Sequence, residues 1–232
     1  MLNTLKEIQY KGILHNDIKP SNICWGKFEN SQLIDIDKFF LIDFGYSRYF
    51  GEFIYKNQNG NNNEKSFKHF AMKYENFFQG TSEYMSIDKS LGKSPNRRSD
   101  CEELLYVIFS LIKNLLPWKL VNSNDHVSRI LEMFKIKTKI LSENLLQEIP
   151  KELVSIYKMV RNLKYEEMPD YNIYNILLKN LLMNNGEIIN TKDKTLLETH
   201  LINFFGDIKA DTIYKNTQDK KYNIFKEYPL KK

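Results

Sequence analysis

One short stretch near the N-terminus limits the fold more than any other part of this 232-residue sequence. The stretch is HNDIKPSN at residues 15–22, and LIDFG follows it at residues 41–45. Two apolar segments, residues 23–25 and 39–42, predict short strands that are joined by a polar turn over residues 27–37, which is longer than a tight hairpin loop. We therefore expect a polar loop, a short hairpin and a second polar motif in immediate succession, with the polar residues of both motifs forming one site.

The side chains of these two motifs suit phosphoryl transfer, which needs a positioned hydroxyl, held metal ions and neutralised charge. Asp17 can orient the attacking hydroxyl, and Lys19 can neutralise phosphoryl oxygens. Asn22 and Asp43 offer the hard oxygen ligands that Mg²⁺ prefers. Taken singly, these residues are better interpreted as a turn former, a helix cap and a surface charge. Their order and separation together favour the catalytic interpretation.

Further motifs give the sequence a family resemblance. They are GTSEYMSID (80–88), LG (91–92), RRSD (97–100), LPW (116–118), RNL (161–163) and PDY (169–171). With the two polar motifs, they resemble the C-terminal lobe of a eukaryotic protein kinase of the casein kinase 1 group, which is related to the vaccinia-related kinases. The segment 80–88 stands where most kinases carry a segment that ends in Ala-Pro-Glu.

The resemblance implies an α+β fold that is mainly α-helical: a kinase C-lobe with short β-hairpins at the active site. It covers residues 1–185, and residues 186–232 are expected to form a C-terminal extension with a basic tail. It also implies ATP and Mg²⁺ as cofactors. A glycine-rich loop, a paired strand lysine and a hinge are missing, so we expect the N-lobe to be absent.

Several roles follow from the resemblance alone. Thr81 would hydrogen-bond Asp17 and Lys19 and tie the substrate loop to the catalytic loop; a turn threonine is the ordinary alternative. Asp100 would accept backbone N–H groups of the catalytic loop, or cap its helix. Cys24 would form the floor of the adenine pocket and bind ATP with Lys19, Asn22 and Asp43, and an inert buried cysteine is the alternative.

A further pair, His15 and Phe44, would pack in the core that links the two lobes. The sequence also departs from the family at two positions. Asn16 replaces the usual arginine, so we expect activity not to depend on phosphorylation of the activation loop. Glu83 replaces an arginine that binds acidic substrates, so that substrate preference cannot be transferred.

The remaining pattern predicts a helix over residues 2–11 and a buried helix over 98–116 that Pro117 ends. It also predicts amphipathic helices near 125–137, 150–162 and 171–184. Residues 51–79 are expected to be loop-like, because residues 57–63 form a low-complexity polar tract. A group of basic residues would lie in this flexible loop: Lys65, Lys68, His69 and Lys73.

Composition excludes several classes of protein. The net charge of +5 makes the sequence mildly basic, without the concentrated basic residues of a nucleic-acid binder. Two cysteines make no disulfide framework. The sequence has no run of transmembrane length and no signal peptide. We therefore expect no nucleic-acid or membrane partner and a cytoplasmic or nuclear location.

Two functions remain open at this point. The first is a serine/threonine protein kinase of casein kinase 1 type that acts on protein substrates. The second is a non-catalytic C-lobe fragment or pseudokinase that serves as a protein-binding module. Without an N-lobe the chain is expected to transfer phosphate weakly or not at all, and a partner protein is expected to cover the surface that the N-lobe would face.

Overall fold

The computed structural model describes residues 1–25, 39–57, 63–75, 78–143 and 145–184. These residues belong to one compact unit, which comprises residues 1–25 and 39–188. The second unit, residues 26–38 and 189–232, lies outside the described residues. The polar turn expected over residues 27–37 and the extension expected over 186–232 therefore lie outside them as well.

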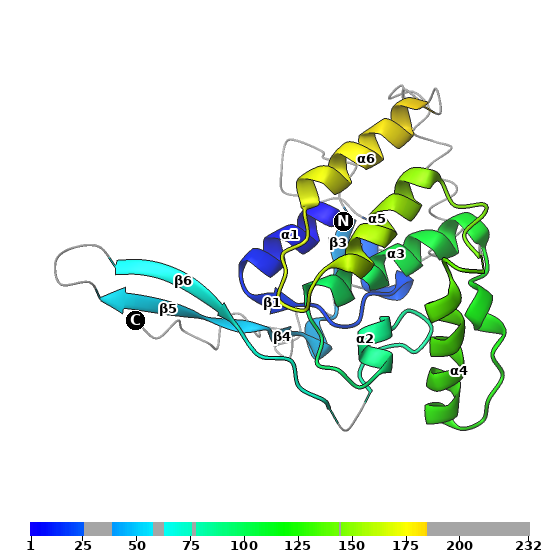
Figure 1. The fold of residues 1–232 in the computed structure, drawn as a ribbon, viewed down its shortest axis with the longest axis horizontal. Coiled ribbons are helices and arrows are strands. Elements are labelled where there is room, and N and C mark those ends of the chain that lie inside the picture. Colours follow the sequence, from blue (N-terminus) through cyan, green and yellow to red (C-terminus); the bar gives the residue numbers. More distant parts are fainter. Residues whose placement is uncertain (26–38, 58–62, 76–77, 144, 185–232) are drawn as a thin grey trace. The chain divides into compact units, whose positions relative to one another are not determined.

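Helices are the main regular secondary structure of the described unit (Figure 1). They are α1 (Leu2–Tyr10), α2 (Ile87–Ser90), α3 (Arg97–Lys113), α4 (His126–Lys139), α5 (Lys151–Asn162) and α6 (Tyr171–Asn184). The helix α3 packs against α1, α2 and α5, while α6 packs against α1 and α5 and α4 packs against α2. The helices predicted from the sequence are confirmed, and α3 has the expected burial from Ser99 to Val107.

Both ends of α3 differ from the prediction. Its N-cap is Asn96, whose side chain forms a capping box with Ser99. Asp100 is therefore not the cap of this helix. At the other end, Asn114 adopts the left-handed conformation with φ 58° and stops the helix before Pro117 is reached. Pro117 instead begins a short 3-10 helix, η3 (Pro117–Leu120).

Three antiparallel strand pairs accompany the helices. The strand β1 (Ile13–Leu14) pairs with β4 (Arg48–Tyr49), and β2 (Ile23–Trp25) pairs with β3 (Phe39–Leu41). The third pair is β5 (Gly51–Asn57) with β6 (Asn63–His69). Short 3-10 helices, η1 (Pro20–Asn22) and η2 (Phe44–Tyr46), follow the catalytic loop and β3. The predicted pairing of residues 23–25 with residues 39–41 is confirmed.

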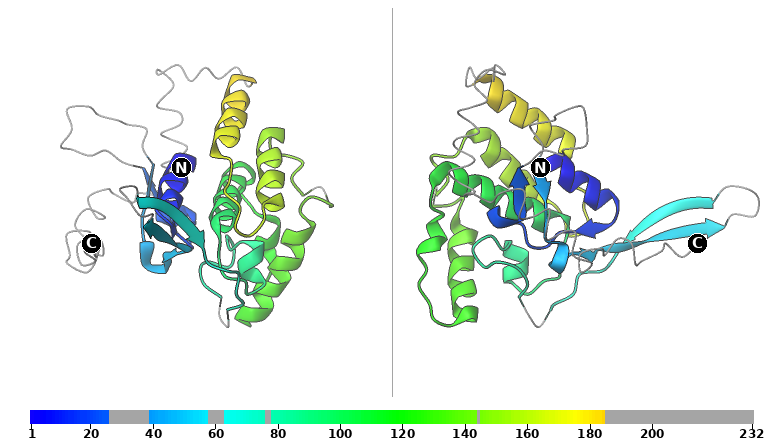
Figure 2. Two further views of the ribbon diagram at one scale, coloured as in Figure 1. Left: turned by 60° about the vertical axis from the view of Figure 1, so that its left-hand side comes forward. Right: turned by 180° about the vertical axis from the view of Figure 1, so that it is seen from behind.

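The prediction of a loop over residues 51–79 is wrong for β5 and β6. These strands pair in register from Gly51 opposite His69 to Asn57 opposite Asn63. Their hairpin extends away from the helices in the views of Figures 1 and 2. The Phe53 and Phe67 rings lie 5.0 Å apart across it, and cross-strand aromatic pairs of this kind stabilise a sheet.

Glycine allows this hairpin to contact the strand pair β1–β4. A Cβ atom on Gly51 would come within 2.4 Å of both the Lys68 carbonyl oxygen and the Phe67 ring. A Cβ atom on Gly12, whose φ is +79°, would meet the same ring at 2.9 Å. Phe67 therefore packs over two positions where only glycine leaves room for it. The polar tract over residues 57–63 predicted a loop, and no pattern in the sequence indicated this packing.

The described part of the chain is thus a helix-rich α+β structure with short antiparallel strand pairs, and the predicted fold class is confirmed at that level. Among its helices, none has the length and apolar character needed to cross a membrane.

Candidate active site

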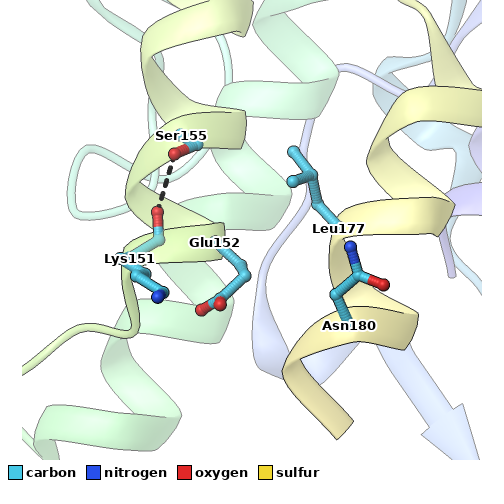
Figure 3. A pocket seen from close by; sticks show the side chains of 5 residues that line it. All are labelled: Lys151, Glu152, Ser155, Leu177 and Asn180. Atoms are coloured by element: carbon cyan, nitrogen blue, oxygen red, sulfur yellow. Dashed lines mark hydrogen bonds between the residues drawn. The ribbon is translucent and has the colours of Figure 1, made fainter. Parts of the chain in front are cut away.

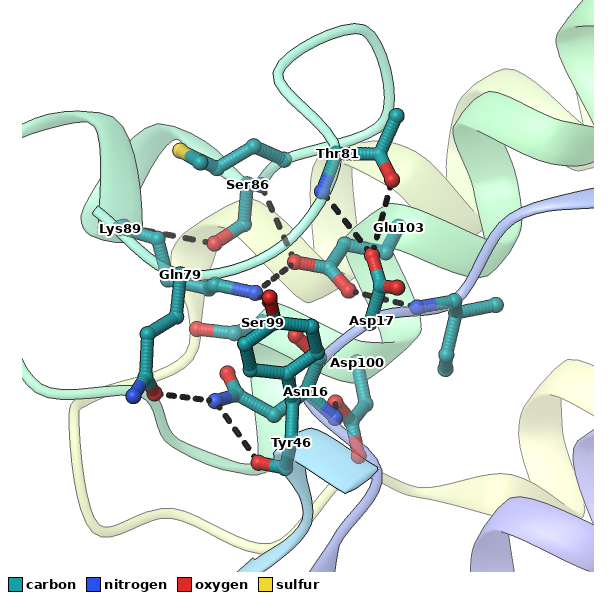
Figure 4. A network of polar contacts seen from close by, with 12 residues as sticks. Asn16, Asp17, Tyr46, Gln79, Thr81, Ser86, Lys89, Ser99, Asp100 and Glu103 are labelled. Atoms are coloured by element: carbon teal, nitrogen blue, oxygen red, sulfur yellow. Dashed lines mark hydrogen bonds and ion pairs between the residues drawn. The ribbon is translucent and has the colours of Figure 1, made fainter. Parts of the chain in front are cut away.

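The loop between β1 and η1 carries Asp17, which is only 2% exposed. Its Oδ1 atom accepts hydrogen bonds from the backbone N–H of Thr81 at 2.9 Å and from the Thr81 hydroxyl at 3.0 Å. Its Oδ2 atom lies 2.8 Å from Lys19 Nζ. Both oxygens of the carboxylate are therefore held by residues that were expected in the site, and Figure 4 shows the two contacts from Thr81.

These contacts control the charge of Asp17. Burial raises the pKa of its carboxyl group, but the ion pair with Lys19 and the hydrogen bonds from Thr81 outweigh burial and lower it below its usual value. The ionised form is the one that can accept a proton from a hydroxyl group. The site therefore favours the state of Asp17 that general-base chemistry requires.

The backbone of the same loop is held from below by Asp100. Its two carboxylate oxygens accept the backbone N–H groups of His15 at 2.8 Å and Asn16 at 2.9 Å. This contact was predicted from the sequence and is confirmed. Complete burial, helped by the nearby charge of Glu103, raises the pKa of Asp100 to about 7.

Two further buried residues support the loop, and the sequence analysis missed both. Glu103 Oε2 accepts the Ile18 N–H at 3.1 Å, and Glu103 Oε1 pairs with Lys89 Nζ at 2.7 Å. Lys89 Nζ also donates to the Asn16 carbonyl oxygen at 2.5 Å. The available signal was the spacing of Asp100 and Glu103, which puts two acids almost one turn apart in an apolar helix, where charges have to be paired.

Asn16 occupies the position where the family pattern has arginine. It has φ 70°, and its amide nitrogen donates to the Tyr46 carbonyl at 3.2 Å and to Gln79 Oε1 at 3.0 Å. Arg48 also donates to Gln79 and pairs with Glu75. Gln79 precedes the Thr81 turn and thereby joins it to Asn16, while Glu75 joins the same segment to Arg48 of β4.

The ring of His15 connects the two polar motifs. Its Nε2 lies 2.9 Å from the Ile42 carbonyl, which can only accept, so Nε2 carries the proton. Its Nδ1 then accepts the Asp17 N–H at 3.4 Å. Burial lowers the pKa of His15 and favours this neutral form. The ring packs edge-on against Phe44, with the centroids 4.8 Å apart, as predicted.

The two candidate metal ligands lie at the ends of β2 and β3. The Ile42 N–H donates to the Asn22 carbonyl at 2.9 Å, which brings Asn22 next to the chain that carries Asp43. The Asn22 amide nitrogen donates to the Asp17 carbonyl at 2.8 Å, so its side-chain oxygen is the atom left for a metal. Asp43 is exposed, has φ 60° and accepts the Gly45 N–H at 3.2 Å.

This donor set fits magnesium. An amide oxygen and a carboxylate are hard ligands, and Mg²⁺ in nucleotide sites takes one or two such protein ligands, with phosphate oxygens and water completing the coordination. Within the described ranges, no group of three or more His, Cys, Asp or Glu side chains could hold a metal ion. A cation at this site would therefore depend on the nucleotide for its remaining ligands.

Cys24 lies in β2, opposite Phe40 of β3, and is partly buried. Burial raises the pKa of its thiol, so it stays protonated and unreactive at neutral pH. Its role as the floor of an adenine pocket remains a prediction.

Glu83 follows Thr81 in the same turn. Its Oε1 atom lies 3.4 Å from Lys119 Nζ, and its carbonyl accepts the Trp118 indole N–H at 2.6 Å. The acid that stands where the family pattern has arginine is thus paired with a neighbouring lysine.

The basic residues that were expected in a flexible loop lie in a strand instead, because Lys65, Lys68 and His69 belong to β6.

Two hollows of the described unit are lined by residues other than Asp17, Lys19, Asn22, Asp43 and Thr81. The larger has a volume of about 410 Å³ and lies between α5 and α6 (Figure 3). It is lined by Lys151, Glu152, Ser155, Leu177 and Asn180. The smaller, of about 10 Å³, is lined by Asn16, Glu75, Gln79, Lys89, Lys93 and Pro95. It has room for about one water molecule.

Comparison with known proteins agrees with these motifs. The chain is 28% identical over 187 residues to casein kinase I homolog 2 of Saccharomyces cerevisiae, which is 81% of this chain and 32% of that protein. It is 27% identical over 186 residues to a protein of Encephalitozoon cuniculi named "probable casein kinase I homolog", which is 80% of this chain and 55% of that protein. The chain resembles the casein kinase I proteins.

The predicted resemblance to casein kinase I is therefore confirmed over about four-fifths of the sequence. A casein kinase I homolog 2 of Schizosaccharomyces pombe gives the same extent, with 26% identity over 81% of this chain and 40% of that protein. No family model matches the sequence. The chain spans about a third to about half of the length of these casein kinase I relatives.

Proposed function

We propose that this protein is a serine/threonine protein kinase of casein kinase 1 type, which transfers the γ-phosphoryl group of ATP to serine or threonine hydroxyls of proteins. The observation that carries the proposal is the arrangement around Asp17: Thr81 on one oxygen, Lys19 on the other, and Asn22 hydrogen-bonded to its backbone. In this proposal the described residues correspond to the C-terminal lobe of the kinase.

The contacts of Asp17 and Lys19 suit the transfer step. Asp17 accepts the proton of the substrate hydroxyl group. The oxygen of that hydroxyl group forms a bond to the γ-phosphorus, and the bond from this phosphorus to the ADP oxygen breaks. Lys19 lies beside this carboxylate and can neutralise charge on the phosphoryl oxygens. The lysine at this place in the loop is also a feature of the family's serine- and threonine-specific members.

Asn22 and Asp43 would hold Mg²⁺ together with the phosphates of ATP, and the bound ion supplies neutralisation of the phosphate charge. Cys24 would lie under the adenine. Thr81 would orient Asp17, and it begins the segment that a protein substrate would contact. The proposed cofactors are therefore ATP and Mg²⁺, and the proposed partners are proteins with accessible serine or threonine residues.

Incorporation of γ-phosphate from labelled Mg-ATP into a serine-rich protein such as casein tests the proposal, with the full chain as enzyme. Any incorporation should be weak for this chain alone and should occur on serine or threonine, with a further loss of about 10²- to 10⁴-fold in Asp17→Asn, because a general base contributes about this much. Asp43→Asn should abolish incorporation of phosphate.

A matched control is Asp170→Asn, which changes a carboxylate at the start of α6 and should leave the rate unchanged. Transfer that survived both Asp17→Asn and Asp43→Asn would overturn the site assignment. Absence of both incorporation and Mg-ATP binding in the unmodified chain would count against the proposed activity itself.

A further inference from the structure

Lys137 is a lysine in an unusual place. It lies on α4 and is 0% exposed, whereas Lys135 and Lys139 of the same helix are exposed. Residues that are two positions apart in the sequence lie about 200° apart around a helix, so Lys137 cannot share a face with Lys135 and Lys139. The sequence spacing therefore already required that one of the three lysines point in a different direction from the others.

The ammonium group of Lys137 has partners within hydrogen-bonding distance. Its Nζ donates to the Ser82 carbonyl at 2.9 Å and to the Met85 carbonyl at 2.7 Å. It also lies 5.2 Å from the ring centroids of both Tyr106 and Trp118, which is within the range of a cation–π contact. The charge thus rests on two backbone carbonyls and two aromatic rings.

Burying the ammonium group of Lys137 costs free energy. Burial lowers the pKa of Lys137 to about 7, and none of the ion pairs among the described residues includes this lysine. A buried ammonium without a paired carboxylate is expensive. An apolar side chain at this position would avoid that cost, so stability of the core alone gives no reason for a lysine here.

What Lys137 holds is the turn from Thr81 to Met85. The Tyr84 and Met85 N–H groups both donate to the Thr81 carbonyl, at 3.0 and 2.9 Å. The first residue of the turn contacts Asp17, and Lys137 binds the carbonyls of its second and last residues. The turn is therefore fixed between the catalytic carboxylate on one side and a buried ammonium group on the other.

We propose that Lys137 is a positioning residue, which fixes the turn Thr81–Met85 so that Thr81 reaches Asp17 and a protein substrate meets a preformed surface. Trp118 acts with it, since its indole N–H donates to the Glu83 carbonyl in the middle of the turn. The catalytic consequence rests on the proposed kinase function, whereas the ordering of the turn does not.

Amide hydrogen exchange of the full chain tests the ordering directly. In Lys137→Met, the amides of Thr81, Tyr84 and Met85 should exchange about 10-fold faster or more, because the turn loses the group that holds its carbonyls. Amides in the middle of α5 should change less than about 2-fold. The matched control is Lys135→Met, which removes an exposed lysine from the same helix and should change neither set.

Trp118→Phe provides a second variant if Lys137→Met does not fold. It removes the donor to Glu83 together with part of the ring beside Lys137, and it should accelerate the same turn amides to a smaller extent. Unchanged exchange at Thr81, Tyr84 and Met85 in a folded Lys137→Met or Trp118→Phe chain would overturn the proposal. Equal acceleration in the turn and in α5 would also overturn it, because that result indicates general destabilisation.

Kinetics then separate this inference from the proposed function. If the chain transfers phosphate, Lys137→Met should raise KM for the protein substrate or lower kcat by about 10-fold, with KM for ATP unchanged. Equal changes in both KM values would contradict a role at the substrate turn. If the unmodified chain neither transfers phosphate nor binds Mg-ATP, the proposed kinase function fails, and hydrogen exchange still decides the role of Lys137.

Discussion

The two polar motifs of the site are held in very different ways. The catalytic loop is buried, and carboxylates of α3 accept three of its N–H groups, those of His15, Asn16 and Ile18. The Asp43 side chain is exposed and accepts a hydrogen bond from Gly45, two residues away, although its neighbours Ile42 and Phe44 contact His15. The catalytic-loop residues are therefore built into the core, while the Asp43 side chain itself is held within its own turn.

This difference has a functional meaning. Positioning of groups supplies much of the catalysis in phosphoryl transfer, and a base that is fixed in advance needs no ordering during the reaction. A metal ligand at the surface can instead be ordered by the ligand that it binds. We therefore expect mutations under the catalytic loop to affect stability and mutations at Asp43 to affect nucleotide binding.

The largest effect on stability is expected from Glu103→Gln. This change leaves the ammonium group of Lys89 buried without its carboxylate partner, and breaking a buried pair in this way costs about 3 to 5 kcal/mol. Urea unfolding would measure the loss. The control is Glu143→Gln, which breaks the exposed pair with Lys139 and should cost less than about 1 kcal/mol. Equal losses in both variants would contradict the account.

Asp100→Ala should have the next largest effect. It leaves the N–H groups of His15 and Asn16 without acceptors in a buried position, which costs about 2 to 5 kcal/mol in total. Asp100→Asn keeps one acceptor oxygen and should lose about half as much. Urea unfolding of the two variants would show this order, and an Asp100→Ala chain as stable as the unmodified chain would refute the role of Asp100.

The pH dependence of stability should distinguish Asp100 from Asp17. The pKa of Asp100 is raised from 3.8 to about 7, so the folded chain keeps a proton that the unfolded chain releases. Its contribution is full below about pH 4 and declines as the pH rises to about 7. The pKa of Asp17 is lowered, so its contribution is lost as the pH falls below about 4.

Unfolding free energies at several pH values would test this assignment. The difference between the unmodified chain and Asp100→Asn should shrink from pH 4 to pH 7 and stay constant above that. A difference that grows over this interval would contradict the raised pKa of Asp100.

The smallest effect on stability is expected from Asp43→Asn. The side chain is exposed, and asparagine tolerates the left-handed backbone that Asp43 adopts, so the unfolding free energy should change by less than about 0.5 kcal/mol. Binding of Mg-ATP should nevertheless be lost, as isothermal titration calorimetry would show. A large loss of stability would mean that the two halves of the site are not held differently.

Much of this site could be predicted from the sequence. The order of Asp17, Lys19, Asn22 and Asp43 indicated one polar site, and the structure brings Asp17, Lys19, Asn22 and Thr81 into contact. The helices were predictable because their apolar residues repeat with helical period. The contact of Asp100 with the loop followed from the family resemblance.

The features that were missed depend on long-range contacts. The sequence does not show which groups Glu103, Lys89 and Lys137 contact, because those partners come from distant parts of the chain. The β5–β6 hairpin was missed because a polar tract separates two segments whose pairing depends on Phe67 packing over Gly12 and Gly51. Local pattern does not reveal such partners.

The most direct test of the account is amide hydrogen exchange of the full chain with and without Mg-ATP. Without nucleotide, the amides of His15, Asn16 and Thr81 should exchange slowly, while that of Gly45 should exchange quickly. Addition of Mg-ATP should slow exchange at Gly45 and leave the other three nearly unchanged. Fast exchange at His15 and Asn16 in the free chain, or no response of Gly45 to Mg-ATP, would contradict the division of the site into a preformed half and a ligand-ordered half.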